Sequence, residues 1–203
     1  RVAALNNLGS TIRDQGRHEV AVRIFQRALR LAEDIGADPT AILGNLGIAQ
    51  RLRSDFPSAL RTFREAERIN CRRRRRFGNA EALANIAVTL GQMGRPKREV
   101  EDVFHRAIEA TAPDNRKHLA RSVAQLAILS REEDPQKAMI LFDQAVTLAG
   151  RAGAEKEMAD SLASQGSLYA KLGNHVVARK YYQRALRIES KIGYRRGFAK
   201  TLR

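Results

Sequence analysis

The sequence predicts an all-α fold, a right-handed α-solenoid of five helix-turn-helix repeats followed by the start of a sixth. Three observations favour this fold. One pattern of apolar and small residues recurs five times, turn signals divide each copy into two segments of helical periodicity, and strand-like alternation is absent. The Gly/Ala position of the pattern steps by 38, 40, 40 and 39 residues, at Gly9, Gly47, Ala87, Ala127 and Gly166. So steady a period indicates stacked copies of one unit.

Each copy contains two apolar stripes that suit two packed helices. In the first copy, the first stripe has the i, i+3, i+4, i+7 spacing of a helix face: Leu5, Leu8, Gly9 and Ile12. The second stripe follows a small-x3-aromatic-x2-Ala pattern: Ala21, Phe25 and Ala28. The turns between the stripes contain Gly or Pro, which suit a helix end and the first turn of the next helix.

The elements follow in order from these signals. We expect helices at residues 1–14, 18–34, 39–53, 57–71, 79–93, 97–111, 116–131, 136–150, 156–172 and 175–191. They define the repeats 1–38, 39–77, 78–114, 115–154 and 155–193 of a single array over 1–203, with 194–203 as a partial helix. The first helix lacks a capping residue and the last is cut short, so we expect a piece of a larger protein.

Composition narrows the possible partners and compartments. The net charge is +15, with 29 arginines among 37 basic residues. That charge favours an acidic partner or nucleic acid, although codon bias and solvated helix faces also account for it. The single cysteine, Cys71, rules out a disulfide framework and fits a reducing cytoplasm. No apolar run is long enough for a bilayer, so we expect no membrane association.

The sequence does not predict an enzyme, a cofactor or a metal site. It contains no phosphate-binding loop of the GxxxxGK[ST] type, no HExxH and no paired CxxC. Of the four histidines, His18 and His175 occupy the same slot in the first and fifth repeats, too far apart to share a metal. We therefore expect a binding module without catalytic residues.

The pattern resembles the tetratricopeptide repeat, whose signature is W-x2-L-G-x2-Y, then A-x3-F, then A and P. The phrases "ALNNLG", "ILGNLG" and "RALRIESKIGYRRG", and the period near 40, resemble the extended repeats of kinesin light chains and of bacterial signalling regulators. The Trp and the closing Pro are missing, and the period exceeds 34. The resemblance implies a scaffold or sensor for protein partners.

One polar column lies opposite the packed face of the first helices. With the Gly/Ala column as position 8, position 6 holds Asn7, Asn45, Asn85, Gln125 and Ser164. Asn is a poor residue for a helix interior, and its amide pairs with both groups of a peptide backbone. We therefore expect this column to bind an extended peptide in the concave groove, as the asparagine ladder of kinesin light chain-type repeats does. The alternative is a structural amide that joins neighbouring first helices, or simple repeat ancestry.

Arginines provide two further candidate sites. Position 12 holds Arg13, Arg51 and Arg131, which either line one lip of the groove and pair with carboxylates or are solvated helix ends. The run Arg72–Arg76 is either a phosphate-binding patch or a solvated loop. The main prediction is thus an acidic peptide partner. The alternatives are a nucleic-acid-binding helical repeat and an architectural module that self-associates.

Overall fold

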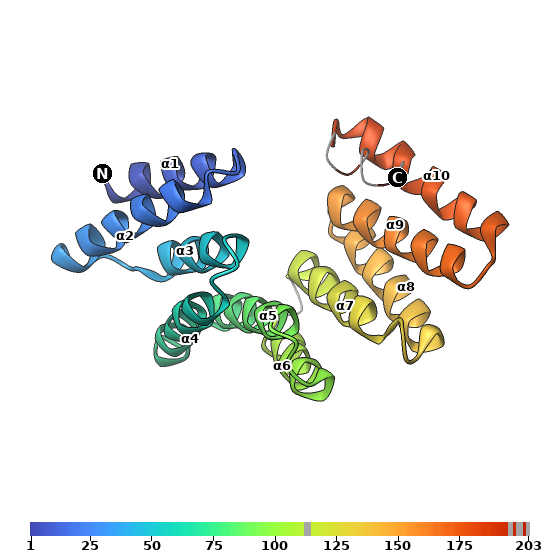
Figure 1. The fold of residues 1–203 in the computed structure, drawn as a ribbon, viewed down its shortest axis with the longest axis horizontal. Helices are drawn as coiled ribbons and strands as arrows, with labels where there is room; N and C mark the ends of the chain where they lie inside the picture. Colours follow the sequence, from blue (N-terminus) through green and yellow to red (C-terminus); the bar gives the residue numbers. More distant parts are fainter. Residues whose placement is uncertain (112–114, 195–196, 198–200, 202–203) are drawn as a thin grey trace. The chain divides into compact units, whose positions relative to one another are not determined.

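The computed structural model describes residues 1–111, 115–194, 197 and 201, apart from the side chains of Arg76 and Phe77. These residues form ten α-helices and no strand (Figure 1). The helices are α1 (Val2–Asp14), α2 (His18–Asp34), α3 (Thr40–Leu52), α4 (Phe56–Arg72), α5 (Arg76–Gln92), α6 (Lys97–Ala110), α7 (Arg116–Ser130), α8 (Pro135–Arg151), α9 (Glu155–Lys171) and α10 (His175–Lys191). The all-α prediction is confirmed. The expected partial helix at 194–203 lies largely outside the described residues.

The helices fall into two compact units. Unit 1 spans Arg1–Ala110 and holds α1 to α6, and unit 2 spans Thr111–Arg203 and holds α7 to α10. Within each unit every helix packs on the next, and first helices of successive repeats also touch, α1 with α3, α3 with α5, and α7 with α9 (Figure 1). Stacked helix hairpins are the expected repeat architecture. The single unbroken array and its right hand stay predictions.

The Gly/Ala column lets the two helices of a repeat approach closely. Gly47 on α3 faces the ring of Phe63 on α4, and a Cβ atom placed on this glycine would lie 2.5 Å from the Cε1 atom of that ring. Gly9 has the same relation to Phe25 of α2, at 2.6 Å. Both rings are fully buried. The repeated glycine and aromatic residue therefore form one packing contact, which explains why they recur together.

Helix boundaries agree with expectation to within one residue, except at the start of α5. We expected this helix to begin at residue 79, but it begins at Arg76. The preceding turn uses Arg74 with a φ of 52°, a left-handed conformation that favours glycine. The turn therefore lies where the sequence has no Gly or Pro to mark it, and Gly78 is a helical residue.

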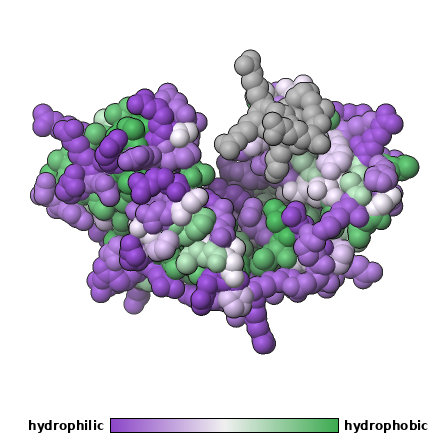
Figure 2. Space-filling model, in the orientation of Figure 1, coloured by the Kyte–Doolittle hydropathy of each residue, from purple (hydrophilic) through white to green (hydrophobic). Residues whose placement is uncertain are grey.

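The surface is polar over most of the face shown in Figure 2, with small hydrophobic patches between hydrophilic residues. Such a surface agrees with a chain of net charge +15. Among the helices that the structure describes, none has the length and apolar character needed to cross a membrane.

Candidate functional site

The position-6 amides of unit 1 lie on three successive first helices and differ in burial. Asn7 of α1 is exposed, Asn45 of α3 is half-buried, and Asn85 of α5 is 9% exposed. Their helices contact one another in order, α1 with α3 and α3 with α5. The sequence register therefore places equivalent amides on neighbouring helices of this unit.

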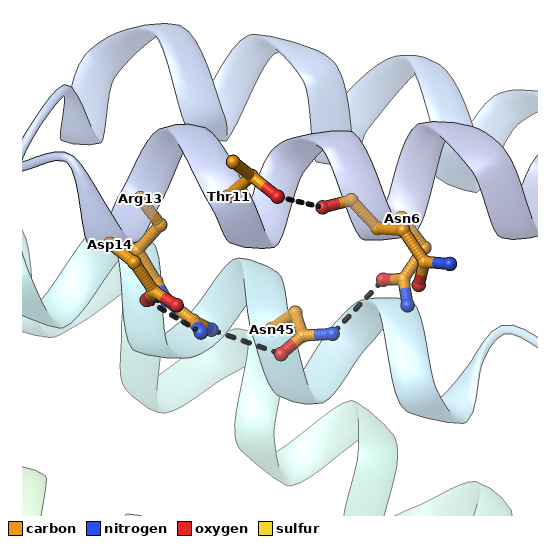
Figure 3. A network of polar contacts seen from close by, with 6 residues as sticks. Asn6, Thr11, Arg13, Asp14 and Asn45 are labelled. Atoms are coloured by element: carbon orange, nitrogen blue, oxygen red, sulfur yellow. Dashed lines mark hydrogen bonds and ion pairs between the residues drawn. The ribbon is translucent and has the colours of Figure 1, made fainter. Parts of the chain in front are cut away.

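Asn45 bonds to the neighbouring first helix through both ends of its amide (Figure 3). Its Nδ2 atom donates to Oδ1 of Asn6 at 3.0 Å, and its Oδ1 atom accepts from Nη1 of Arg13 at 3.0 Å. Arg13 in turn pairs with Oδ1 of Asp14 at 3.0 Å. This network corresponds to the structural alternative for the column, an amide that joins α1 to α3. A peptide would have to exchange with these bonds to reach Asn45.

The position-12 arginines of unit 1 also reach across to the next first helix. Arg51 on α3 donates from Nη1 to Oε1 of Gln92, the last residue of α5, at 3.2 Å. Arg13 reaches from α1 to a different position of the next first helix, Asn45. Both guanidinium groups thus join consecutive repeats.

In unit 2 the two columns make different contacts. Ser164 donates to the backbone oxygen of Asp160 at 2.8 Å, so its hydroxyl is used within α9, while Gln125 on α7 is half-buried. Arg131 follows α7 as its C-cap residue and pairs through Nε with Oε1 of Glu132 at 3.3 Å. Hydrogen bonding from Lys171, at the end of α9, lowers the pKa of Glu132, so this carboxylate stays ionised. Arg131 therefore belongs to a surface charge cluster.

Two arginines of the run Arg72–Arg76 bond to the loop between α2 and α3. Arg73 pairs through Nη1 with Oδ1 of Asp38 at 3.0 Å, and Arg75 pairs with the other carboxylate oxygen. Asp38 also accepts from the backbone nitrogen of Thr40 at 3.1 Å. Burial alone would raise the pKa of Asp38, but the bonds from Arg75 and Thr40 outweigh it and lower the pKa. Two of the five arginines therefore have a structural role.

A pocket of about 420 Å³ opens between α3, α4 and α5 of unit 1. Its apolar lining consists of Phe63 and of small residues, among them Ala41, Gly44 and Ala66. Its polar lining includes two amides, Asn85 and Asn70, of which Asn70 is 4% exposed. Neither amide side chain has a hydrogen-bond partner among the described residues. A primary amide both donates and accepts, so groups that enter this pocket find two amides that the described protein residues leave unused.

Sequence reasoning missed Asn70 as a pocket residue. A signal was present, because Asn70 occupies a column that holds Ala32 in the first repeat and Ala149 in the fourth, both fully buried. An Asn in place of a buried Ala inside a helix is unfavourable unless its amide has a use. The reason for Gly78 was also missed: a Cβ atom there would lie 2.5 Å from Oδ1 of Asn70, so the glycine makes room for the amide.

Unit 2 contains a second polar cluster that the sequence did not indicate. Gln165 takes the position of Leu46 and Leu126 in the pattern and is 1% exposed, with its Nε2 atom donating to Oδ1 of Asp143 at 2.7 Å. Nearby, the rings of Tyr169 and Tyr181 stack at 5.2 Å between centroids. Burial is the main cause that raises the pKa of Tyr181. These contacts join α8, α9 and α10.

Within the described part of the chain, no group of three or more His, Cys, Asp or Glu residues could hold a metal ion. Cys71 is a free, exposed thiol whose Sγ atom donates to Oδ1 of Asn79 at 3.3 Å. The candidate site of this chain is therefore the first-helix face of unit 1, with its amides and its pocket.

Comparison with known proteins agrees with the helix-hairpin repeats. The tetratricopeptide repeat family matches this chain in two places. One description of the family matches residues 1–72, and another description of it matches residues 159–192. Together these residues make up a little over half of the chain. The chain therefore belongs to the tetratricopeptide repeat family. A search of curated proteins found no match.

Solved structures share the fold at low sequence identity. A Rap protein complexed with Competence and Sporulation Factor matches with a TM-score of 0.84 and 13% identity, covering 97% of this chain and 56% of that one. The apo quorum sensor NprR from B. thuringiensis matches with a TM-score of 0.79 and 13% identity, and the match covers 99% of this chain and 57% of NprR. Nearly identical TPR-like repeats of a putative kinesin light chain from Podosopora anserina match with a TM-score of 0.67 and 14% identity. That match covers 95% of this chain and 96% of the other. This chain thus spans little more than half the length of Rap and NprR.

Proposed function

We propose that this chain is a protein-binding module that holds an extended segment of a partner against the first helices of unit 1. The observation that carries the proposal is the series of position-6 amides on α1, α3 and α5. The side chains of Asn7 and Asn85 bond to no other described residue, which leaves their donors and acceptors for a ligand. A primary amide pairs with the N–H and C=O of a peptide backbone whatever its side chains.

Within this proposal the amides have two roles. Asn7 and Asn85 contact the bound segment directly. Asn45 braces α1 against α3 through Asn6 and Arg13, and so fixes the spacing of the helices that carry the contacts. Packed helices lie about 8–10 Å apart, so amides on successive first helices meet an extended peptide roughly every third residue. In unit 2, Gln125 is the equivalent contact.

The charge of the chain favours an acidic partner. A net charge of +15 attracts acidic segments and raises their association rate, and exposed arginines pair with carboxylates on arrival. Such steering weakens as salt rises, because the Debye length falls to about 8 Å at physiological ionic strength. The proposed partner is therefore an acidic segment, with its backbone held by amides and its carboxylates steered by arginine.

The similar structures support a role in signalling. Rap was solved in complex with Competence and Sporulation Factor, and NprR is described as a quorum sensor. By analogy with these two proteins, we propose that the chain is the sensing or recruiting part of a cytoplasmic regulatory protein and has no catalysis of its own.

Selection from a random twelve-residue peptide library displayed on phage tests the proposal. Peptides from the selected clones are synthesised, and their affinity is measured by fluorescence anisotropy for the native chain and for the double variant Asn7→Ala, Asn85→Ala. Each lost backbone pairing is worth about 1 kcal/mol, so the double variant should bind about 10- to 30-fold more weakly.

The matched control is Asn115→Ala. Asn115 precedes α7 and makes no side-chain cap bond, so this exchange should leave affinity unchanged. Equal affinity of the double variant and the native chain, or failure to select any peptide, would contradict the proposal. The selected sequences also test the charge argument, because they should be enriched in Asp and Glu.

The same preparation tests the two alternatives. The exposed residues of the run Arg72–Arg76 favour nucleic acid as the second candidate, and a mixed RNA pool titrated at two salt concentrations would then bind with a steep salt dependence. An architectural module would instead self-associate, which sedimentation at two protein concentrations detects.

A further inference from the structure

The pocket between α3, α4 and α5 contains more polar groups than backbone capture requires. Asn85 lines it from α5, and Asn70 lines it from α4. Asn70 is 4% exposed, and Asn85 is 9% exposed. Two amides that line one cavity, are nine-tenths buried and lack a partner among the described residues offer donors and acceptors that a ligand group can take over from water.

The room around Asn70 depends on glycine. A Cβ atom on Gly78 would lie 2.5 Å from Oδ1 and 2.7 Å from Nδ2 of Asn70, so any larger residue at 78 would displace the amide. On α3, a Cβ atom on Gly44 would meet nothing within 4 Å, so the pocket borders open space beside this residue. The pocket is thus open at α3 and polar at α4.

The charged residues of the lining restrict the charge of the occupant. Glu81 of α5 lines the pocket and would repel a carboxylate. Arg75 lines it as well, with its guanidinium paired to Asp38, and would repel an ammonium or guanidinium group. A neutral group that both donates and accepts avoids both repulsions. A primary amide is such a group, and it forms paired hydrogen bonds with another primary amide.

We infer that this pocket is a side-chain subsite that takes a glutamine or asparagine of the bound segment, with Asn70 and Asn85 pairing with its amide. The inference rests on the proposed function, because it assigns one residue of the segment held on the first-helix face. It adds sequence specificity to the surface, because Asn85 then contacts a side chain of the segment as well, whereas Asn7 contacts only backbone.

The test uses a probe small enough to occupy the pocket alone, N-acetyl-glutamine N-methylamide. It is titrated into the ¹⁵N-labelled chain while the side-chain resonances of Asn70 and Asn85 and the backbone amide of Gly44 are followed by NMR. A ligand of this size reaches a dissociation constant on the order of 1 mM at ordinary ligand efficiency. The glutamate and lysine analogues should respond at least fivefold more weakly.

A variant of the open wall separates pocket binding from folding. Gly44→Leu extends a side chain into the pocket without meeting protein atoms at its Cβ, and should weaken the probe response at least fivefold. Gly91→Leu is the matched control, because Gly91 is exposed on α5 and does not line the pocket. Both variants should keep the native helical circular dichroism signal.

The inference fails if all three analogues respond equally, if Gly44→Leu binds the glutamine probe like the native chain, or if no saturable response occurs up to about 50 mM, far above the expected constant. None of these results affects the phage selection, which measures peptide binding independently of the pocket. The pocket assignment and the proposed function can therefore fail separately.

Discussion

Replacing either of two glycines on the same helix by alanine should change the free energy of unfolding in opposite directions. Gly44 and Gly47 lie three residues apart on α3, and neither has a left-handed backbone. An added Cβ at Gly44 meets nothing within 4 Å, so Gly44→Ala gains only helix propensity, about 0.5–1 kcal/mol. At Gly47 the same atom would lie 2.5, 2.7 and 2.8 Å from three carbons of Phe63.

The cost at Gly47 follows from the burial of Phe63. The ring is fully buried, so it cannot move away into solvent, and overpacking of this kind costs about 1–3 kcal/mol. Subtracting the gain in propensity leaves Gly47→Ala about 1 kcal/mol less stable than the native chain. The two variants should therefore differ by about 2 kcal/mol, or about 4–8 °C in melting temperature for a chain of this size.

Thermal and urea unfolding followed by circular dichroism at 222 nm measures this difference. Gly91→Ala, exposed on α5, is the control for propensity alone and should behave like Gly44→Ala. The third and fourth repeats already carry Ala87 and Ala127 in this column, so the penalty at Gly47 reflects the local spacing of α3 and α4. If Gly47→Ala stabilised the chain as much as Gly44→Ala does, the packing explanation for the glycine column would be refuted.

Three further predictions concern polar contacts. Gln165→Leu should raise the free energy of unfolding by about 1 kcal/mol, because it replaces a buried amide whose Oε1 atom has no partner by the leucine of the pattern. Asn45→Ala should lower it by about 1–2 kcal/mol, since it breaks both bonds between α1 and α3. Asp38→Asn should lower the free energy of unfolding by up to about 1 kcal/mol at pH 7, because the pairs with Arg73 and Arg75 weaken. The bonds from Thr40 should remain.

Urea unfolding at matched pH tests these predictions. The folded state lowers the pKa of Asp38, so its contribution is present above the unfolded pKa and is lost as pH falls through the folded value. The difference between Asp38→Asn and the native chain should therefore shrink below about pH 4. A constant difference from pH 7 to pH 3 would exclude the ion pairs as its cause. A Gln165→Leu variant less stable than the native chain would instead indicate that the bond to Asp143 outweighs the buried amide.

The sequence alone determined the repeat register and the residues that pack. The regular step of the Gly/Ala column placed nine of ten helices to within one residue of each end. It also put Gly9 and Phe25, and Gly47 and Phe63, at matching positions of the repeat, and the structure shows that each pair is in contact. The exception, α5, begins after a turn built on Arg74, whose backbone conformation its side chain does not reveal.

Only the tertiary structure decided what the amides do. Asn7, Asn45 and Asn85 are equivalent in sequence, yet Asn45 joins two helices, Asn7 faces solvent and Asn85 lines a pocket. Which of these occurs depends on the groups that the next helix brings within about 3 Å, such as Asn6 and Arg13, and periodicity does not contain that information. The pocket itself needs Asn70 and Gly78 from different helices, so it exists only once α3, α4 and α5 have packed together.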